Sequence, residues 1–214
     1  QPHTGCDESH PYPEHYESFY PQTKAMAEQL VMKANCDTLL TVSLRPHLIW
    51  GPRDAHILPG IIARAKEGKL IQVGDGKNMV DMVYVEDAAR AHLQAADALM
   101  PGSPLAGRTY FITQDEPVNL WEWIANLLTQ LGLQPPKRNI SLSTARTIGA
   151  VMEFAYRWLP LQGEPRMTKF LASELAMSHY YDISRAKKDF CYQPQYTMTA
   201  ALEKTLPWLR ENLL

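Results

Sequence analysis

Tyr20 and Lys24 stand four residues apart in the stretch YESFYPQTK, residues 16–24, where a helical pattern begins. Residues four apart lie on one face of a helix, with about 5–6 Å between their Cβ atoms. A lysine ammonium at this distance stabilises the phenolate form of a tyrosine and suits it to general acid or base catalysis. The ammonium can also donate a hydrogen bond to a ribose hydroxyl. The alternative is that both residues belong to an ordinary solvated helix face.

The elements around this pair predict a strand that follows a helix. Ser18 is a suitable N-cap and Pro21 falls in the first turn, where a missing N–H costs little, so we expect a helix over 19–35. The run TLLTVSL, 38–44, is short, apolar and β-branched, which predicts a strand buried on both faces, as in a parallel sheet. Arg45 and Pro46 end that strand.

The middle of the chain predicts a turn and two further helices. A helix is expected over 57–66, and Gly74 to Asn78 should form a hairpin turn between strands 70–73 and 79–85. Asp87 is a candidate cap for an alanine-rich helix, 88–100. Strand 109–113 follows, and the expected later helices begin at the Asn119 cap: 119–131, 143–159, 165–177, 184–190 and 199–213. Alternating strands and helices in the first half favour an α/β fold with a parallel sheet, and the second half is mainly helical.

Composition excludes several classes of protein. The chain of 214 residues has a formal net charge of −2, which predicts no nucleic-acid partner. No apolar run approaches the roughly 20 residues of a membrane span. Cys6, Cys36 and Cys191 are far apart and form no CxxC pair, which favours a reducing cytoplasm over a disulfide framework or a zinc site. The seven histidines show no ligand spacing, and we propose no metal.

Several short sequence motifs follow one another along the chain around and after the Tyr20–Lys24 pair. The chain contains PYP followed by YPQTK, an AE pair and an AN ending, 11–35. It continues with LRPHLIWGPRD, VGDGKNMVDMVYVEDAARAH, GRTYFITQDEP and AKKDFCYQPQYTM. These blocks resemble those of the extended short-chain dehydrogenases/reductases, in particular the 3β-hydroxysteroid dehydrogenase family. This resemblance implies the carboxyl-terminal part of a Rossmann-type, doubly wound NAD(P)-binding fold and a smaller, mainly helical substrate domain.

The resemblance also implies roles for single residues. Tyr20 would give the proton to a ketone oxygen, and Lys24 would hold the nicotinamide ribose, so both would contact the cofactor. The backbone of Pro46, His47 and Leu48 would meet the nicotinamide carboxamide at the carboxyl end of a strand, where open α/β sheets bind ligands. The catalytic serine or threonine of the family is expected before Gln1.

The substrate implied by the resemblance is small and lipid-like. Within the family, the features YPEH and LIWGPRD and the block PRMTKF are similar to those of bacterial reductases that convert 2-alkyl-3-oxo fatty acids to 3-hydroxy acids with NADPH. Val80 replaces the arginine of nucleotide-sugar relatives, which favours an apolar substrate. We predict substrate contacts at four residues, which are Trp50, His56, Met82 and Tyr84.

The chain contains no GxxGxxG phosphate loop. In the family that loop lies upstream, so we expect this chain to be a fragment that does not turn over alone. Residues 1–50 would belong to the Rossmann domain, with 79–113 returning to it, and 51–78 and 114–214 would form the substrate domain. Helix 20–35 would form a homodimer. NADP or NAD is the expected coenzyme, with NADPH favoured. A 3β-hydroxysteroid or sterol dehydrogenase and a non-catalytic module that binds apolar ligands are the alternatives.

Overall fold

A computed structural model describes residues 2–16, 19–159, 161–163 and 165–214. It divides into two compact units: one holds Pro2, 59–80 and 118–179, and the other holds 3–58, 81–117 and 180–214. We predicted that 51–78 and 114–214 would form the substrate domain, and this assignment stays a prediction. Residues 180–214 lie in the same unit as the helix that carries Tyr20, where Ala186, Phe190 and Tyr192 join the core.

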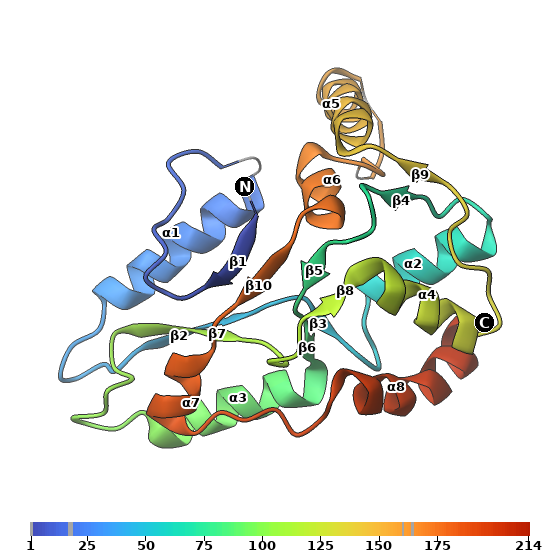
Figure 1. Cartoon of the computed structure of the whole chain (residues 1–214). Helices are drawn as coiled ribbons and strands as arrows, with labels where there is room; N and C mark the ends of the chain where they lie inside the picture. The colour runs from blue at the N-terminus through green and yellow to red at the C-terminus, as the bar shows by residue number, and fades with distance from the viewer. Residues whose placement is uncertain (1, 17–18, 160, 164) are drawn as a thin grey trace. The chain divides into compact units, whose positions relative to one another are not determined.

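The first unit is built from short strands and helices (Figure 1). Its elements are α2 (Ile57–Lys66), which begins in the second unit, β4 (Gln72–Val73), β5 (Met79–Val80), β8 (Val118–Asn119), α4 (Leu120–Gln130), β9 (Asn139–Ile140), α5 (Leu142–Trp158) and α6 (Lys169–Ala176). The Asn119 side chain caps α4 by accepting from the backbone N–H groups of Trp121 and Glu122, as predicted. The predicted bounds of α2 are also confirmed.

The predicted hairpin around Gly74 is wrong. β4 pairs with β9 in parallel, and β5 pairs with β8 in the antiparallel sense. Gly74 and Gly76 do adopt positive φ angles of 83° and 76°, and the Asp75 carboxylate accepts from the Lys77 N–H at 3.0 Å. The glycines therefore make a local turn, but distant segments supply the partners of both flanking strands.

The second unit contains a parallel strand pair between helices. Its elements are β1 (His3–Cys6), α1 (Phe19–Lys33), β2 (Val42–Pro46), β3 (Ile49–Trp50), β6 (Val83–Tyr84), α3 (Val85–Ala98), β7 (Arg108–Ile112), α7 (Ser184–Phe190) and α8 (Met198–Leu213), with β10 (His179–Tyr181) entering it from the first unit. β2 pairs with β7 and β3 with β6, both in parallel, which confirms the predicted parallel pairing. The predicted cap Ser18 lies outside the described residues.

β2 has two different faces, although we predicted that the run 38–44 would be buried on both. The strand itself begins only at Val42, and all five of its residues are half-buried. Val42 and Leu44 pack against the core beside α3. Ser43 and Arg45 point to the other side, where their side chains bind Glu28 of α1. Alternate strand residues face opposite sides of a sheet, so α1 and α3 lie on opposite faces of β2 (Figure 1).

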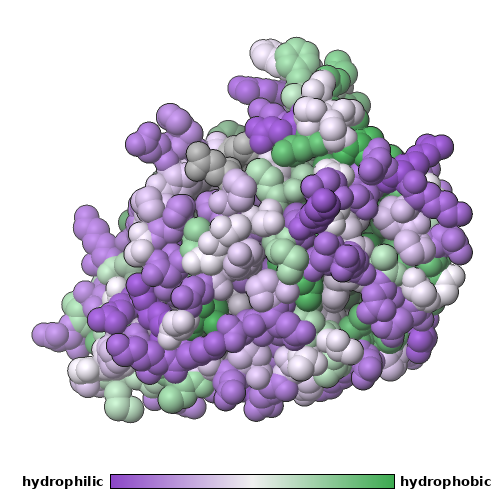
Figure 2. All heavy atoms as spheres, viewed as in Figure 1, coloured by the Kyte–Doolittle hydropathy of each residue, from purple (hydrophilic) through white to green (hydrophobic). Residues whose placement is uncertain are grey.

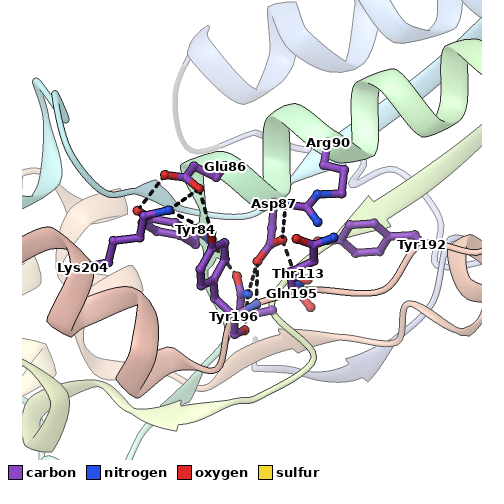
Figure 3. A network of polar contacts seen from close by, with 10 residues as sticks. Tyr84, Glu86, Asp87, Arg90, Thr113, Tyr192, Gln195, Tyr196 and Lys204 are labelled. Carbon is purple, nitrogen blue, oxygen red and sulfur yellow. Dashed lines mark hydrogen bonds and ion pairs between the residues drawn. The ribbon is translucent and has the colours of Figure 1, made fainter.

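α3 packs closely through its alanines, as predicted. Ala88, Ala91 and Ala95 are at most 3% exposed and belong to the apolar core. Asp87, however, is not the cap, because α3 begins at Val85. The fully buried Asp87 carboxylate accepts from the Gln195 N–H at 2.9 Å (Figure 3). It also accepts from the Gln114 side-chain amide at 2.6 Å. It therefore holds the segment before α8 against the first turn of α3.

The face drawn in Figure 2 is covered mostly by hydrophilic side chains, with hydrophobic ones between them. None of the helices in the described ranges is long and apolar enough to cross a membrane. Cys6, Cys36 and Cys191 are free thiols.

Candidate active site

Tyr20 and Lys24 lie together on the exposed surface of α1. The Tyr20 side chain is 69% exposed, and Lys24 is also exposed. Lys24 Nζ lies 5.9 Å from the centre of the Tyr20 ring, as expected for residues one helical turn apart. The phenol and the ammonium are therefore neighbours and both are accessible to a ligand.

The direction of α1 places this pair at the carboxyl end of β2. The Thr41 hydroxyl donates to the Val31 carbonyl at 3.1 Å, and the Ser43 hydroxyl donates to the Glu28 carboxylate at 2.8 Å. Later residues of the strand contact earlier residues of the helix, so the strand and the helix run antiparallel. One helical turn is about 5.4 Å and two strand residues about 6.6 Å. Lys24, one turn before Glu28, is therefore about level with the end of β2.

Pro46 is the last residue of β2, and His47 and Leu48 follow it; we predicted that these three residues contact the cofactor. β2 ends at Pro46, and the His47 N–H donates to the Ile112 carbonyl at 3.0 Å. Leu48 has a positive φ of 46°, and its carbonyl accepts from the Val83 N–H at 3.3 Å. The loop is therefore fixed by β7 and β6. Its contact with a cofactor stays a prediction.

The His47 ring is fixed by a buried acid. His47 Nδ1 lies 2.5 Å from the Asp81 carboxylate, which is completely buried. The other Asp81 oxygen accepts from the Tyr181 N–H at 2.7 Å. Asp81 therefore fixes the direction of the imidazole just after the end of β2.

The four predicted substrate residues lie in different surroundings. Trp50, Met82 and Tyr84 are at most 1% exposed, and the rings of Trp50 and Tyr84 are 5.7 Å apart in an edge contact. They pack as core residues, and a substrate could reach them only if their side chains became accessible. His56 is exposed beside the start of α2. The substrate role of all four stays a prediction.

The sequence patterns did not identify a polar cluster that lies near Tyr20 and Lys24. We call Tyr12, Glu28, Ser43 and Arg45 the Glu28 cluster. Arg45 binds the Glu28 carboxylate with two groups, Nε at 2.8 Å and Nη2 at 2.5 Å, and the Tyr12 and Ser43 hydroxyls also donate to it. The block AE and the Arg45-Pro46 dipeptide were the signals in the sequence, but nothing in it indicated that the two meet.

The Glu28 carboxylate is held in its charged form. Burial alone would raise the pKa of Glu28, but hydrogen bonds from Arg45, Tyr12 and Ser43 outweigh it, and the pKa lies below its ordinary value of 4.5. Glu28 therefore stays ionised at neutral pH and attracts the Arg45 guanidinium.

Comparison with known proteins identifies the group to which the chain belongs. A family model described as the 3-beta hydroxysteroid dehydrogenase/isomerase family matches residues 1–143. The chain belongs to this family. The resemblance seen in the sequence blocks is thereby confirmed.

Three curated relatives match almost all of the chain. A 2-alkyl-3-oxoalkanoate reductase of Stenotrophomonas maltophilia is 44% identical over 200 residues, which are 94% of this chain and 60% of the relative. The protein of the same name from Shewanella oneidensis is 41% identical and covers 94% and 54%. The human sterol-4-alpha-carboxylate 3-dehydrogenase, decarboxylating, is 35% identical and covers 90% and 53%. The chain thus spans a little over half the length of these relatives.

Solved structures confirm the fold class. The crystal structure of gox2253 matches with a TM-score of 0.69 at 23% identity, over 97% of this chain and 61% of that one. The UDP-glucuronic acid 4-epimerase of Bacillus cereus in complex with NAD matches with a TM-score of 0.67 at 19% identity, over 100% and 58%. At these identities the likeness shows the fold alone, which is the Rossmann-type α/β fold of the short-chain dehydrogenases/reductases.

Proposed function

We propose that the protein is an NAD(P)-dependent reductase that converts a 2-alkyl-3-oxo fatty acid to the 3-hydroxy acid. The observation that carries this proposal is the exposed Tyr20–Lys24 pair on α1, level with the end of β2. Two relatives named 2-alkyl-3-oxoalkanoate reductase, at 44% and 41% identity, support this substrate class.

The described residues fit the nicotinamide end of a dinucleotide. Lys24 offers an exposed ammonium for the ribose hydroxyls, and the fixed backbone of 46–48 offers peptide groups. The sequence contains no GxxGxxG loop, so the proposal takes the pyrophosphate site to lie in another part of the protein. Relatives of the same fold are complexes with NAD and with NADPH. We propose NADPH, as the resemblance to the reductases suggests.

In this proposal the two side chains divide the proton chemistry. The bound nicotinamide supplies the hydride that reduces the ketone carbon. The Tyr20 hydroxyl donates its proton to the ketone oxygen, which becomes the hydroxyl of the product. Lys24 stabilises the phenolate that remains and holds the ribose, and the phenolate then regains a proton from water.

The proposal extends to the substrate and to the assembly. Val80, which is fully buried, stands where nucleotide-sugar enzymes carry an arginine, and this supports an apolar substrate. Phe19, Met26 and Leu30 of α1 are 84%, 55% and 69% exposed, which supports a homodimer through α1. The free thiols support a cytoplasmic location. The buried Trp50, Met82 and Tyr84 and the exposed His56 remain our proposed substrate contacts.

A second candidate is a sterol dehydrogenase. Relatives named sterol-4-alpha-carboxylate 3-dehydrogenase, decarboxylating, from Candida albicans and human are 37% and 35% identical. These identities are lower than those of the two reductases.

Turnover of defined substrates tests the proposal. The protein at its full natural length should oxidise NADPH in the presence of a long-chain 2-alkyl-3-oxo acid. It should oxidise NADPH faster than it oxidises NADH. It should not reduce NAD or NADP with a 3β-hydroxy-4α-carboxysterol. Turnover of the sterol alone would favour the second candidate. Binding of apolar ligands without any turnover would favour a non-catalytic binding module.

A further inference from the structure

α1 is attached to its unit without a buried apolar face. Its fifteen residues, Phe19–Lys33, include none that is fully buried, and large apolar side chains such as Leu30 stay exposed. Most helices in folded domains are held by burial of an apolar stripe. Among the described residues, polar contacts join α1 to β2 and the residues beside it.

Glu28 provides such contacts. Its side chain is only 9% exposed. One carboxylate oxygen accepts from Arg45 Nη2 and the Tyr12 hydroxyl, and the other accepts from Arg45 Nε and the Ser43 hydroxyl. A carboxylate has about four acceptor positions, so this one is saturated. Charge-assisted hydrogen bonds of this type fix both the distance and the angle between the two groups, whereas apolar contacts are non-directional.

Arg45, the partner of Glu28 in the cluster, is also fixed in position. The Arg45 guanidinium lies 5.2 Å from the centre of the Phe111 ring and 5.5 Å from that of Tyr12. Arg45 belongs to β2, which pairs with β7 as far as Pro46 and Ile112. The position of the guanidinium is therefore fixed by the strand pair, and Arg45 lies one residue before the loop 46–48.

We infer that Glu28 is a positioning residue that holds Tyr20 and Lys24 level with the loop 46–48. Lys24 lies one helical turn before Glu28, and Tyr20 lies two turns before it. Arg45 directly precedes Pro46. The ion pair between Glu28 and Arg45 thus links the helix that carries the proposed catalytic pair to the loop that is proposed to contact the cofactor. This inference rests on the proposed function.

A second carboxylate in the same unit provides a matched control. Asp189 accepts from Arg108 Nη1 at 3.3 Å and from the Tyr110 hydroxyl at 2.8 Å, and its side chain is 8% exposed. It therefore resembles Glu28 in burial and in its arginine and tyrosine partners. Arg108 pairs with Val42, at the end of the strands opposite Pro46. Loss of Asp189 should lower stability without moving the catalytic pair.

The test compares Glu28→Gln with Asp189→Asn in the protein at its full natural length. Glutamine keeps the shape of Glu28 but removes the charge that Arg45 binds. We expect Glu28→Gln to lower kcat by roughly 10- to 100-fold, because small misplacements of reacting groups have effects of this size. The KM for the oxo acid should change little, and amide hydrogen exchange in 19–33 should accelerate. Asp189→Asn should leave kcat and that exchange unchanged.

The outcomes separate this inference from the proposed function. If Glu28→Gln and Asp189→Asn have the same kcat and the same exchange in α1, Glu28 has no positioning role. If the unsubstituted protein does not reduce the oxo acid, the proposed function fails, and faster exchange in α1 of Glu28→Gln alone then decides whether Glu28 fixes the helix.

Discussion

α1 and α3 lie on opposite faces of the same strand and are held there by different forces. α3 presents Ala88, Ala91 and Ala95 to an apolar core that includes the inward side chains of β2. α1 has no fully buried residue and binds the polar side of β2 through Glu28. Apolar packing is strong but non-directional, whereas a bidentate ion pair fixes one geometry. The helix with the proposed catalytic pair is the one held by directional bonds.

The largest difference between the two helices should appear when side chains are enlarged. Ala91→Leu on α3 should lower the free energy of unfolding by about 1–3 kcal/mol or more, because the core there is full. Ala27→Leu on α1 is the matched control at an exposed position, and it should change the free energy by less than about 0.5 kcal/mol. Chemical denaturation measures both. Equal losses would show that α1 is packed as closely as α3.

Acid should loosen α1 in a way that depends on Glu28. The pKa of Glu28 is lower in the folded protein than its ordinary value of 4.5, so the unfolded chain takes up this proton first as the pH falls. The stabilisation is therefore complete above about pH 4.5 and is lost as the pH falls through the folded-state pKa.

The measurement is the difference in free energy of unfolding between the unsubstituted protein and Glu28→Gln as a function of pH. This difference should be constant near neutral pH and shrink in acid. A difference that stays the same down to pH 3 would contradict the role given to the charge on Glu28.

The smallest effect is expected from a single hydroxyl. Tyr12→Phe removes one donor to Glu28 but leaves both bonds from Arg45, so it should cost about 0.5–1.5 kcal/mol. Tyr180→Phe is the control, because the Tyr180 hydroxyl has no hydrogen bond to another described residue. Thermal unfolding should show a lower Tm for Tyr12→Phe alone. Identical values would mean that Tyr12 does not support the cluster.

Local signals in the sequence predicted local structure. The expected helix over 57–66 coincides with α2, and the Asn119 cap located α4, because both depend on neighbouring residues. The hairpin at Gly74 was wrong because a turn does not determine which strands pair. Asp87 looked like a cap, yet its acceptors are used by Gln195 and Gln114, which are distant in sequence.

The same limit applies to the candidate site. The spacing of Tyr20 and Lys24 was sufficient to place them on one helix face. The contact of Glu28 with Arg45 spans 17 residues and joins a helix to a strand, and no periodic pattern encodes it. The sequence also did not indicate that Trp50, Met82 and Tyr84 are buried, because their burial depends on how the helices and strands pack.

The most direct test of the account is the Tyr20→Phe variant of the protein at its full natural length. Its kcat for the 2-alkyl-3-oxo acid and its Kd for NADPH should be measured together. Loss of the proton donor should lower kcat by roughly 10²–10⁴-fold, and Kd should stay nearly unchanged, because the ring and Lys24 remain. A Tyr20→Phe protein that keeps the kcat of the unsubstituted enzyme would contradict the assignment of this pair as the catalytic site.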